Sequence, residues 1–185
     1  MKWVLIGLFL IPPLFLIGTQ ANQEGTLQTV DELDVEKYLG KWYAIASIET
    51  FFNSSCAWGN RAEYSRREDG RISVKNTCYK ENGEKREVSA AAWVPDESEP
   101  GRLKVSFIPF LGYRLFPADY LVIELGENYE YAVVGHPSRS LGWILSRQPT
   151  MEEEKMDRIA ENLESVGYDF SDFKINRQKP LQEDN

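Results

Sequence analysis

Cysteine and histidine, the residue types most often used for nucleophilic and metal chemistry, occur only three times in the 185 residues, as Cys56, Cys78 and His136. His136 is followed by Pro137 and Ser138, a turn sequence that favours a position on the surface. A single histidine cannot build a histidine-rich zinc site, and a Ser–His or Cys–His pair would depend on this one loop residue. We therefore expect no metal, no cofactor and no catalytic residue, and the chain is predicted not to be an enzyme.

The two cysteines flank a segment with the pattern of a β-hairpin. Strand-like runs at 56–66 and 71–79 are separated by a Glu-Asp-Gly turn at 68–70. Cys56 and Cys78 fall at the ends away from the turn and share strand parity with apolar residues. In an exported chain such a pair most simply forms a disulfide, which would stabilise the fold by about 3 kcal/mol in the chain-entropy model. Two free thiols are the alternative.

A second group of residues joins the two ends of the predicted strand series. Gly40 and Trp42 open the first strand-like run, and Arg147 closes the last. The first and last strands of an up-and-down barrel are neighbours, so the Arg147 guanidinium can lie across the Trp42 indole face. Such a cation–π contact is worth about 0.5–2 kcal/mol. It would close one end of the barrel and leave binding to the open end.

Eight strand-like runs lie between and around these residues. Asp-Gly, Asn-Gly, Pro and Gly-Glu-Asn turn signals separate them. The runs extend over 42–49, 58–66, 72–79, 87–94, 103–107, 119–125, 129–135 and 141–147. Short connections favour antiparallel neighbours, and eight such strands close into a barrel with room for side chains or one small ligand. The expected fold class is all-β, an eight-stranded antiparallel up-and-down β-barrel.

Helical spacing occurs only after Pro149 and Thr150. Apolar residues then recur at three- and four-residue intervals up to Gly167, and these are Met156, Ile159, Ala160, Leu163 and Val166. Because the apolar stripe covers one face only, we expect one C-terminal α-helix packed on the barrel. A helical turn at 34–39 and a short final strand at 170–176 complete the expected elements.

The first residues have the pattern of a secretory signal peptide. The apolar stretch 3–17 is short for a bilayer span, Pro12 and Pro13 interrupt it, and small residues precede a cleavage point after Ala21. An uncleaved anchor helix is the alternative. No cysteine follows this stretch to carry a lipid, so we expect an exported protein, periplasmic or extracellular, that lacks a lipobox. Association with the outer membrane stays open.

The chain therefore divides into four segments. We expect a signal peptide at 1–21, a flexible N-terminal segment at 22–33, the barrel domain at 34–180 and a polar tail at 181–185. The 21 basic side chains include Lys2, so removal of the signal peptide would leave 20 basic and 29 acidic side chains. This balance repels nucleic acid and anionic lipid head groups, and we expect no nucleic-acid partner.

Strand parity predicts which side chains face the barrel interior. If Trp42 points inward, alternation places a mixture of small, aliphatic, aromatic and polar residues there as candidate ligand-binding residues. These are Ala44, Ala46, Ile48, Val74, Asn76, Ala90, Ala92, Val105, Phe107, Tyr131 and Val133. The alanines leave volume for a ligand, and Asn76 and Tyr131 could orient its polar group. A packed barrel, in which the alanines only relieve crowding, is the alternative.

The connection 107–116 is unusually apolar and contains Phe110, Leu111, Tyr113 and Leu115. Exposed apolar loops of this kind mark interaction surfaces. We expect it to form a rim that contacts ligand, makes a peripheral membrane contact or meets a second protomer. Ordinary packing over the barrel mouth is the alternative. The expected oligomeric state is a monomer or a weak homodimer.

Three blocks of the sequence resemble the motifs of the lipocalin family. The block 38–46, with the sequence YLGKWYAIA, looks like the first motif, 129–135 looks like the second and 143–149 looks like the third. Two further stretches, 103–107 and 120–123, are similar to the group that contains the bacterial outer-membrane lipocalin, apolipoprotein D and the plant temperature-induced lipocalins. Three motifs in order, at barrel spacing and followed by a helix, make the resemblance specific.

The resemblance implies an exported protein that carries or stores a small hydrophobic ligand, such as a fatty acid or lysophospholipid, with a role in cell-envelope lipid maintenance. Two alternatives stay open. One lipocalin group, the prostaglandin D synthases, isomerises its ligand with a barrel cysteine, so a thiol-dependent lipid isomerase would require reduced Cys56. A surface protein with a filled barrel is the other.

Overall fold

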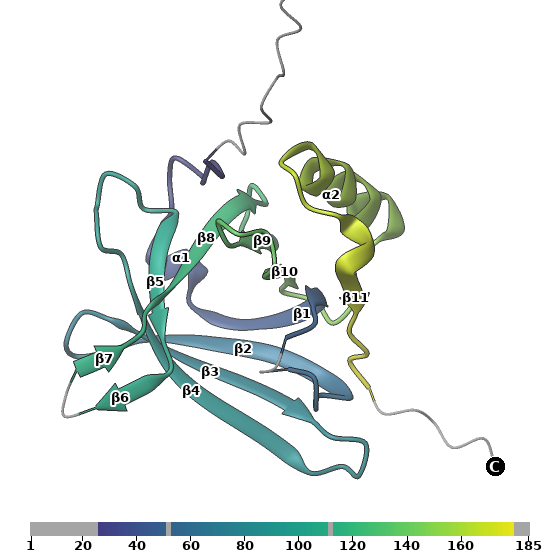
Figure 1. Cartoon of the computed structure of the whole chain (residues 1–185), viewed down its shortest axis with the longest axis horizontal. Helices are drawn as coiled ribbons and strands as arrows, with labels where there is room; N and C mark the ends of the chain where they lie inside the picture. Colours follow the sequence, from purple (N-terminus) through teal and green to yellow (C-terminus); the bar gives the residue numbers. More distant parts are fainter. Residues whose placement is uncertain (1–25, 51–52, 111–112, 180–185) are drawn as a thin grey trace, which may run out of the picture.

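The computed structural model describes residues 26–50, 53–110 and 113–179. The predicted signal peptide at 1–21 and the predicted polar tail at 181–185 lie outside the described residues. Eight antiparallel strands form a closed barrel, and one helix follows them and lies against its outer face (Figure 1). The predicted fold class is confirmed.

The barrel strands follow one another in chain order. They are β1 (Gly40–Ile48), β2 (Trp58–Arg66), β3 (Ile72–Tyr79), β4 (Lys85–Trp93), β5 (Arg102–Ser106), β8 (Ala118–Leu125), β9 (Tyr131–Gly135) and β10 (Gly142–Ser146). Each pairs antiparallel with the next, and β10 also pairs with β1, which closes the barrel. β9 begins at Tyr131, later than the predicted 129, because Tyr129 has a φ of +59° in the preceding turn.

The remaining elements connect or cover the barrel. They are α1 (Val35–Tyr38), β6 (Ile108–Phe110), β7 (Tyr113–Leu115), α2 (Glu153–Ser165), a 3-10 turn η1 (Phe170–Asp172) and β11 (Phe173–Ile175). β6 and β7 form a hairpin within the apolar connection between β5 and β8. Neither described helix has the length and apolar content needed to cross a membrane.

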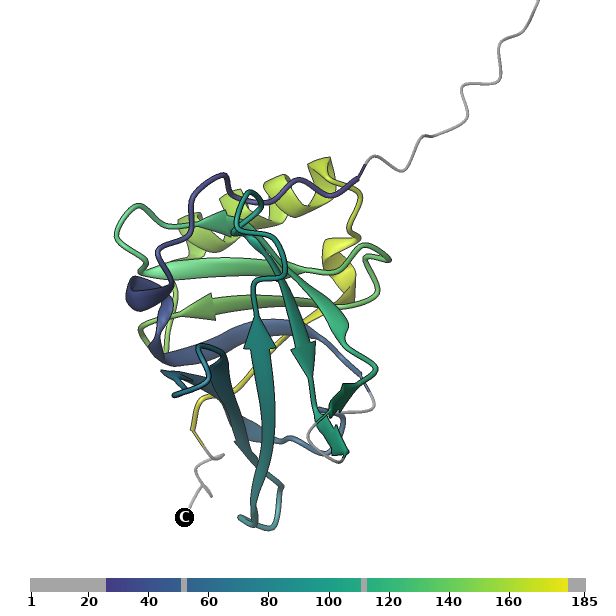
Figure 2. The ribbon, with the colours of Figure 1, turned by 90° about the vertical axis from the view of Figure 1, so that its left-hand side faces the viewer.

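The helix α2 packs on the outside of the barrel, beside β9 and β10 (Figures 1 and 2). Glu153 and Glu154 lie in its first turn, where negative charge is favourable. Ile159 and Leu163 are completely buried in contact with the barrel. Gly167 ends the helical segment at a φ of +90°, a conformation that favours glycine.

The buried side chains form two clusters on opposite sides of the barrel wall. The inner cluster lies on the inside of the wall and includes Tyr38, Trp42 and Leu103. The outer cluster lies between the wall and α2 and includes Leu121 and Ile144. Strands β9 and β10 are therefore buried on both faces.

An irregularity in β1 changes which of its side chains face inward. The register of β1 against β10 shifts between Ala44 and Ala46. An extra residue in a strand reverses the alternation beyond it, so Ala46 and Ile48 belong to the outer cluster. The ladder between β1 and β2 extends from Gly40 to Tyr43, and β11 pairs with the following part of β1.

Of the segment predicted to be flexible at 22–33, residues 26–33 pack on the barrel, and residues 22–25 lie outside the described residues. Leu27 is 3% exposed within the outer cluster. The backbone N–H of Val30 donates to the carbonyl oxygen of Val122 at 2.9 Å. Isolated apolar residues in a polar segment have no period from which this packing could be predicted.

Candidate functional site

Arg147 and Trp42 close one end of the barrel. The Arg147 guanidinium lies 3.7 Å from the centroid of the fully buried Trp42 ring, so the predicted cation–π contact is present. The same guanidinium donates hydrogen bonds to the carbonyl oxygens of Lys37, Lys41 and Tyr129 at 2.6, 2.9 and 3.2 Å. These bonds connect α1, β1 and the turn before β9, and so close this end of the barrel.

Gly40 is required beside this closed end. Its φ is +91°, which is costly for residues that carry a Cβ atom. A Cβ atom at this position would lie 3.5 Å from Nη1 of Arg147. Since 3.5 Å is an ordinary van der Waals distance, the positive φ is what favours glycine at this position.

A cavity of about 330 Å³ occupies the barrel interior. Small-molecule sites have volumes of about 300–1,000 Å³, so this cavity suits one small ligand. Its walls are mostly apolar and include Ala44, Ala62, Tyr64, Val74, Val88, Val105, Phe107, Tyr120, Trp143 and Leu145. The polar residues that line it include Asn53, Asn60, Asn76, Thr77, Arg86 and Asp119. An apolar chamber with a few polar groups can hold a hydrophobic molecule and orient its polar end.

Three tyrosines, which we call the tyrosine triad, lie at the inner end of the cavity. The Tyr120 hydroxyl is hydrogen-bonded to the hydroxyls of Tyr38 at 2.7 Å and Tyr64 at 2.9 Å. The Tyr38 ring lies 5.0 Å from that of Trp42, so the triad rests on the closed end. Burial raises the pKa of all three phenols, that of Tyr64 to about 12, and the triad is uncharged at neutral pH.

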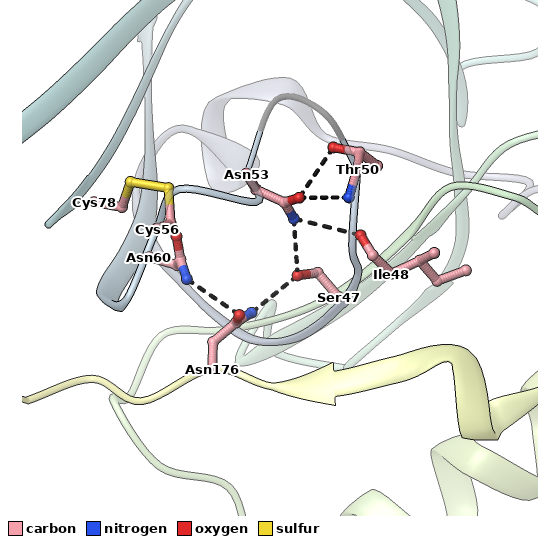
Figure 3. The surroundings of a disulfide bond; sticks show 8 residues. All are labelled: Ser47, Ile48, Thr50, Asn53, Cys56, Asn60, Cys78 and Asn176. Atoms are coloured by element: carbon pink, nitrogen blue, oxygen red, sulfur yellow. Dashed lines mark hydrogen bonds between the residues drawn. A yellow bond between two sulfur atoms is a disulfide. The ribbon is translucent and has the colours of Figure 1, made fainter. Parts of the chain in front are cut away.

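Cys56 and Cys78 form the predicted disulfide (Figure 3). Both residues line the cavity, and the sequence contains no other cysteine. While the bond is intact, neither sulfur is a thiolate nucleophile. A thiol-dependent isomerase would first require reduction of this disulfide.

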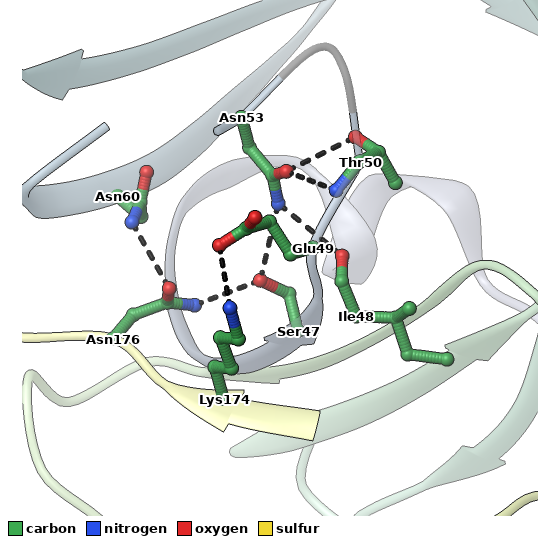
Figure 4. Close-up of polar contacts among 8 residues, drawn as sticks. All are labelled: Ser47, Ile48, Glu49, Thr50, Asn53, Asn60, Lys174 and Asn176. Carbon is green, nitrogen blue, oxygen red and sulfur yellow. Dashed lines mark hydrogen bonds and ion pairs between the residues drawn. The ribbon is translucent and has the colours of Figure 1, made fainter. Parts of the chain in front are cut away.

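Side-chain amides gather next to the disulfide, where the segment after β11 lies between β1 and β2 (Figures 3 and 4). Asn53 Nδ2 donates to Ser47 Oγ at 3.4 Å and to the carbonyl oxygen of Ile48 at 3.3 Å. Asn176 Nδ2 donates to Ser47 Oγ at 3.1 Å, and its Oδ1 accepts from Asn60 at 3.1 Å. We call Ser47, Asn53, Asn60 and Asn176 the amide seam. Because Asn53 and Asn60 also line the cavity, the seam is part of the cavity wall.

A smaller hollow of about 130 Å³ lies beside the amide seam. Its lining includes Glu49 and Lys174, which form an ion pair at 2.7 Å (Figure 4). Asn53 and Cys56 line both hollows, so they separate the two. The small volume and polar lining do not suit a hydrophobic ligand, and we assign the site to the larger cavity.

Five of the predicted interior residues line the cavity, namely Ala44, Val74, Asn76, Val105 and Phe107. Ala90 and Ala92 belong to the inner cluster but are not part of the cavity lining. Ala90 pairs with Val74 and Ala92 pairs with Ile72, and both of these partners pack in the inner cluster.

The predicted inward orientation is wrong for Ala46, Ile48, Tyr131 and Val133, which pack in the outer cluster under α2. The β1 irregularity accounts for the first two.

The error in β9 has a different cause. Ala132 pairs with Leu145, and Leu145 pairs with Ala44, which lines the cavity. Directly opposed residues share a face, so Ala132 and Val134 point inward. Since both faces of β9 are buried, its apolar pattern does not distinguish them.

Four of the cavity residues that sequence reasoning missed are Tyr64, Val88, Tyr120 and Trp143. Val88 has the parity of the predicted Ala90, so alternation could have identified it. Ala62 pairs with Trp42, so Tyr64, two residues further along β2, lies on the same face. Finding Tyr64 from the sequence would have required the register of β2 against β1. Tyr120 and Trp143 become apparent only once the strands are paired.

Comparison with known proteins identifies the family. A family model described as a lipocalin-like domain matches residues 33–178. Temperature-induced lipocalin-1 from Arabidopsis thaliana is 38% identical over 153 residues, covering 81% of this chain and 82% of that protein. Outer membrane lipoprotein Blc from Vibrio cholerae is 37% identical over 166 residues, covering 88% and 93%. The solved structure of insecticyanin from the tobacco hornworm Manduca sexta has the same fold, with a TM-score of 0.66, 22% identity and coverage of 83% and 85%. The chain therefore belongs to the lipocalin family.

Proposed function

We propose that this lipocalin binds and carries a fatty acid, a lysophospholipid or a similar lipid in its barrel cavity. Lipocalins bind small hydrophobic ligands. The observation that carries the proposal is the apolar chamber of about 330 Å³ above the closed end. Its walls bring together small and aromatic side chains, which bury an acyl chain favourably.

Polar residues at the outer part of the cavity support an acyl lipid with an anionic head group. Arg86 lies near the start of β4, at the end of the barrel away from Arg147, and lines the cavity. A guanidinium matches the geometry of a carboxylate or phosphate. In our proposal the acyl chain extends toward the tyrosine triad and the head group lies on the Arg86 side.

The rim and the relatives support a role at a lipid surface. Phe116 lines the cavity and is 82% exposed. An exposed aromatic residue at a cavity mouth suits transient contact with a lipid layer, from which the ligand would be taken. The Vibrio cholerae relative is named an outer membrane lipoprotein. We propose export and a role in lipid maintenance of the cell envelope, with the protein acting as a carrier.

The opposite faces of β4 provide a test with a matched control. Val88 lines the cavity, whereas the neighbouring Ser89 is exposed on the other face. Val88→Trp should fill the chamber and weaken binding of a fluorescent fatty acid at least tenfold. Ser89→Trp adds the same side chain outside the barrel and should bind as the wild type does.

The experiment measures the dissociation constant by fluorescence titration after both variants are shown to be folded by circular dichroism. Undiminished binding by a folded Val88→Trp protein would contradict the assignment of this cavity. A wild-type protein that binds no fatty acid or lysophospholipid would contradict the proposed function.

A further inference from the structure

We propose that the tyrosine triad donates a hydrogen bond to the ligand, and that the preferred ligand is a lipid whose buried end carries a neutral oxygen. A hydroxyl or carbonyl group on the acyl chain would supply that oxygen. The inference rests on the proposed function, because it assumes that an acyl chain occupies the cavity.

The triad has one more hydroxyl proton than its own hydrogen bonds use. Tyr38, Tyr64 and Tyr120 carry three hydroxyl protons, and the two hydrogen bonds that join them use two. Among the described residues, these hydroxyls have no further hydrogen-bond partner. One O–H group of the triad is therefore left without an acceptor in the part of the chain that the structure describes.

The unused O–H group can lie on any of the three tyrosines, and their surroundings differ. Tyr38 is 2% exposed and does not line the cavity, so a free O–H there would be buried without an acceptor. Tyr64 and Tyr120 both line the cavity. If the unused proton lies on either of them, it can point into the chamber and reach a ligand. A buried donor without an acceptor is costly, so the arrangements that place the unused O–H on Tyr64 or Tyr120, facing the cavity, are favoured.

A neutral acceptor on the ligand matches this O–H group. The phenols are protonated at neutral pH, since an ordinary tyrosine has a pKa of 10.0 and burial raises the pKa of each further. They present a donor without a charge, and an acyl chain that ends in a methyl group would leave this donor unsatisfied. A hydroxyl or carbonyl oxygen at the inner end of the chain accepts the bond. The head group at the same time lies on the Arg86 side of the cavity.

The test compares two ligands of equal length. In ω-hydroxydodecanoic acid a hydroxyl replaces the terminal methyl group of tridecanoic acid. Calorimetry gives the affinity ratio of the two acids for each protein, and their different solubilities in water cancel when ratios are compared. Either single Tyr→Phe change at 64 or 120 leaves a hydroxyl that faces the cavity, so the double variant Tyr64→Phe/Tyr120→Phe is needed.

We expect the double variant to lose the preference for the hydroxy acid by about tenfold, the ordinary effect of one buried hydrogen bond. Tyr168→Phe is the control. This change removes a buried hydroxyl that donates to the carbonyl oxygen of Leu141. Because Tyr168 belongs to the outer cluster, the variant should keep the wild-type affinity ratio of the two acids. Equal ratios in all three proteins would overturn the inference and leave the carrier function standing.

A measurement on the wild type covers the case in which the double variant does not fold. A tyrosine that starts to donate a hydrogen bond absorbs at longer wavelength, so the hydroxy acid should shift the near-ultraviolet tyrosine band and tridecanoic acid should not. Identical spectra with both bound acids would overturn the inference. Failure of the wild type to bind either acid would overturn the proposed function and this inference with it.

Discussion

Replacement of Arg147 by alanine should loosen the closed end of the barrel while leaving the choice of ligand unchanged. The guanidinium makes a cation–π contact with Trp42 at 3.7 Å and donates to three carbonyl oxygens. All of these groups lie at the end of the barrel away from Arg86, where we place the ligand head group. The effect should therefore appear in stability.

The contacts of Arg147 determine the expected magnitude. A partly exposed cation–π contact contributes about 1 kcal/mol. Buried hydrogen bonds from a charged donor contribute about 1.5–3 kcal/mol each. Water can partly replace the Arg147 guanidinium as a donor, so we count about 0.7 kcal/mol for each of its three hydrogen bonds. The sum is about 3 kcal/mol. For a domain of this size, each kcal/mol lowers Tm by about 2–4 °C, which gives a decrease of about 10 °C.

Differential scanning calorimetry provides the assay, and Arg147→Lys is the matched control. Lysine keeps a positive charge near the Trp42 ring but cannot reach three carbonyl oxygens with one ammonium group. The Tm of Arg147→Lys should therefore lie between those of the wild type and Arg147→Ala. If Arg147→Ala melts within about 2 °C of the wild type, the hydrogen bonds to the three carbonyl oxygens contribute far less than 0.7 kcal/mol each, and the expected magnitude is refuted. A changed ligand preference without a change in Tm would contradict the structural assignment of Arg147.

Three further predictions concern stability. Gly40→Ala should lower the free energy of unfolding by about 1–2 kcal/mol in urea titrations, because the φ of Gly40 is +91°. Gly70→Ala is the control, since Gly70 has a φ of +77° with open space around it, so this variant reports the backbone strain without a contact to Arg147. The double variant Cys56→Ala/Cys78→Ala should lose about 3 kcal/mol and release ligand faster in stopped-flow measurements, because both residues line the cavity. The folded state holds the Tyr64 proton up to a pKa of about 12, against 10.0 for an ordinary tyrosine. This contribution to stability is complete below pH 10 and is lost as pH rises to about 12, which urea midpoints across that range would reveal.

The number and order of strands could be predicted from the sequence because turn residues and alternation are local signals. Antiparallel neighbours joined by short loops leave few alternative topologies. The closed end could also be predicted, since Trp42 and Arg147 stand at the two termini of the strand series and closure brings them together. The disulfide followed from two cysteines at the open ends of one hairpin.

The side of the wall on which some residues lie could not be predicted. Ala44, Ile45 and Ala46 are all small or apolar, so nothing in their types marks the irregularity that reverses β1. In β9 the apolar residues on both faces are equivalent as sequence, because α2 covers the outer face. The tyrosine triad joins residues 38, 64 and 120, and its hydrogen bonds depend on strand register across the whole barrel.

The amide seam has a consequence for how this barrel can diverge. Backbone ladders have nearly the same spacing whatever the sequence, so they hold the circumference of a barrel constant. Beyond Tyr43, the backbone of Asn176 and Arg177 bridges the wall, because the N–H of Asn176 donates to the carbonyl oxygen of Ile45 and the N–H of Gly59 donates to that of Arg177. The side chains of Ser47, Asn53 and Asn176 add hydrogen bonds beside this backbone bridge. Their length and bonding change with a single codon, while the ladders elsewhere stay intact. Substitution at the seam should therefore change the polar lining of the chamber, while the backbone bonds to Ile45 and Gly59 keep the strands at their spacing.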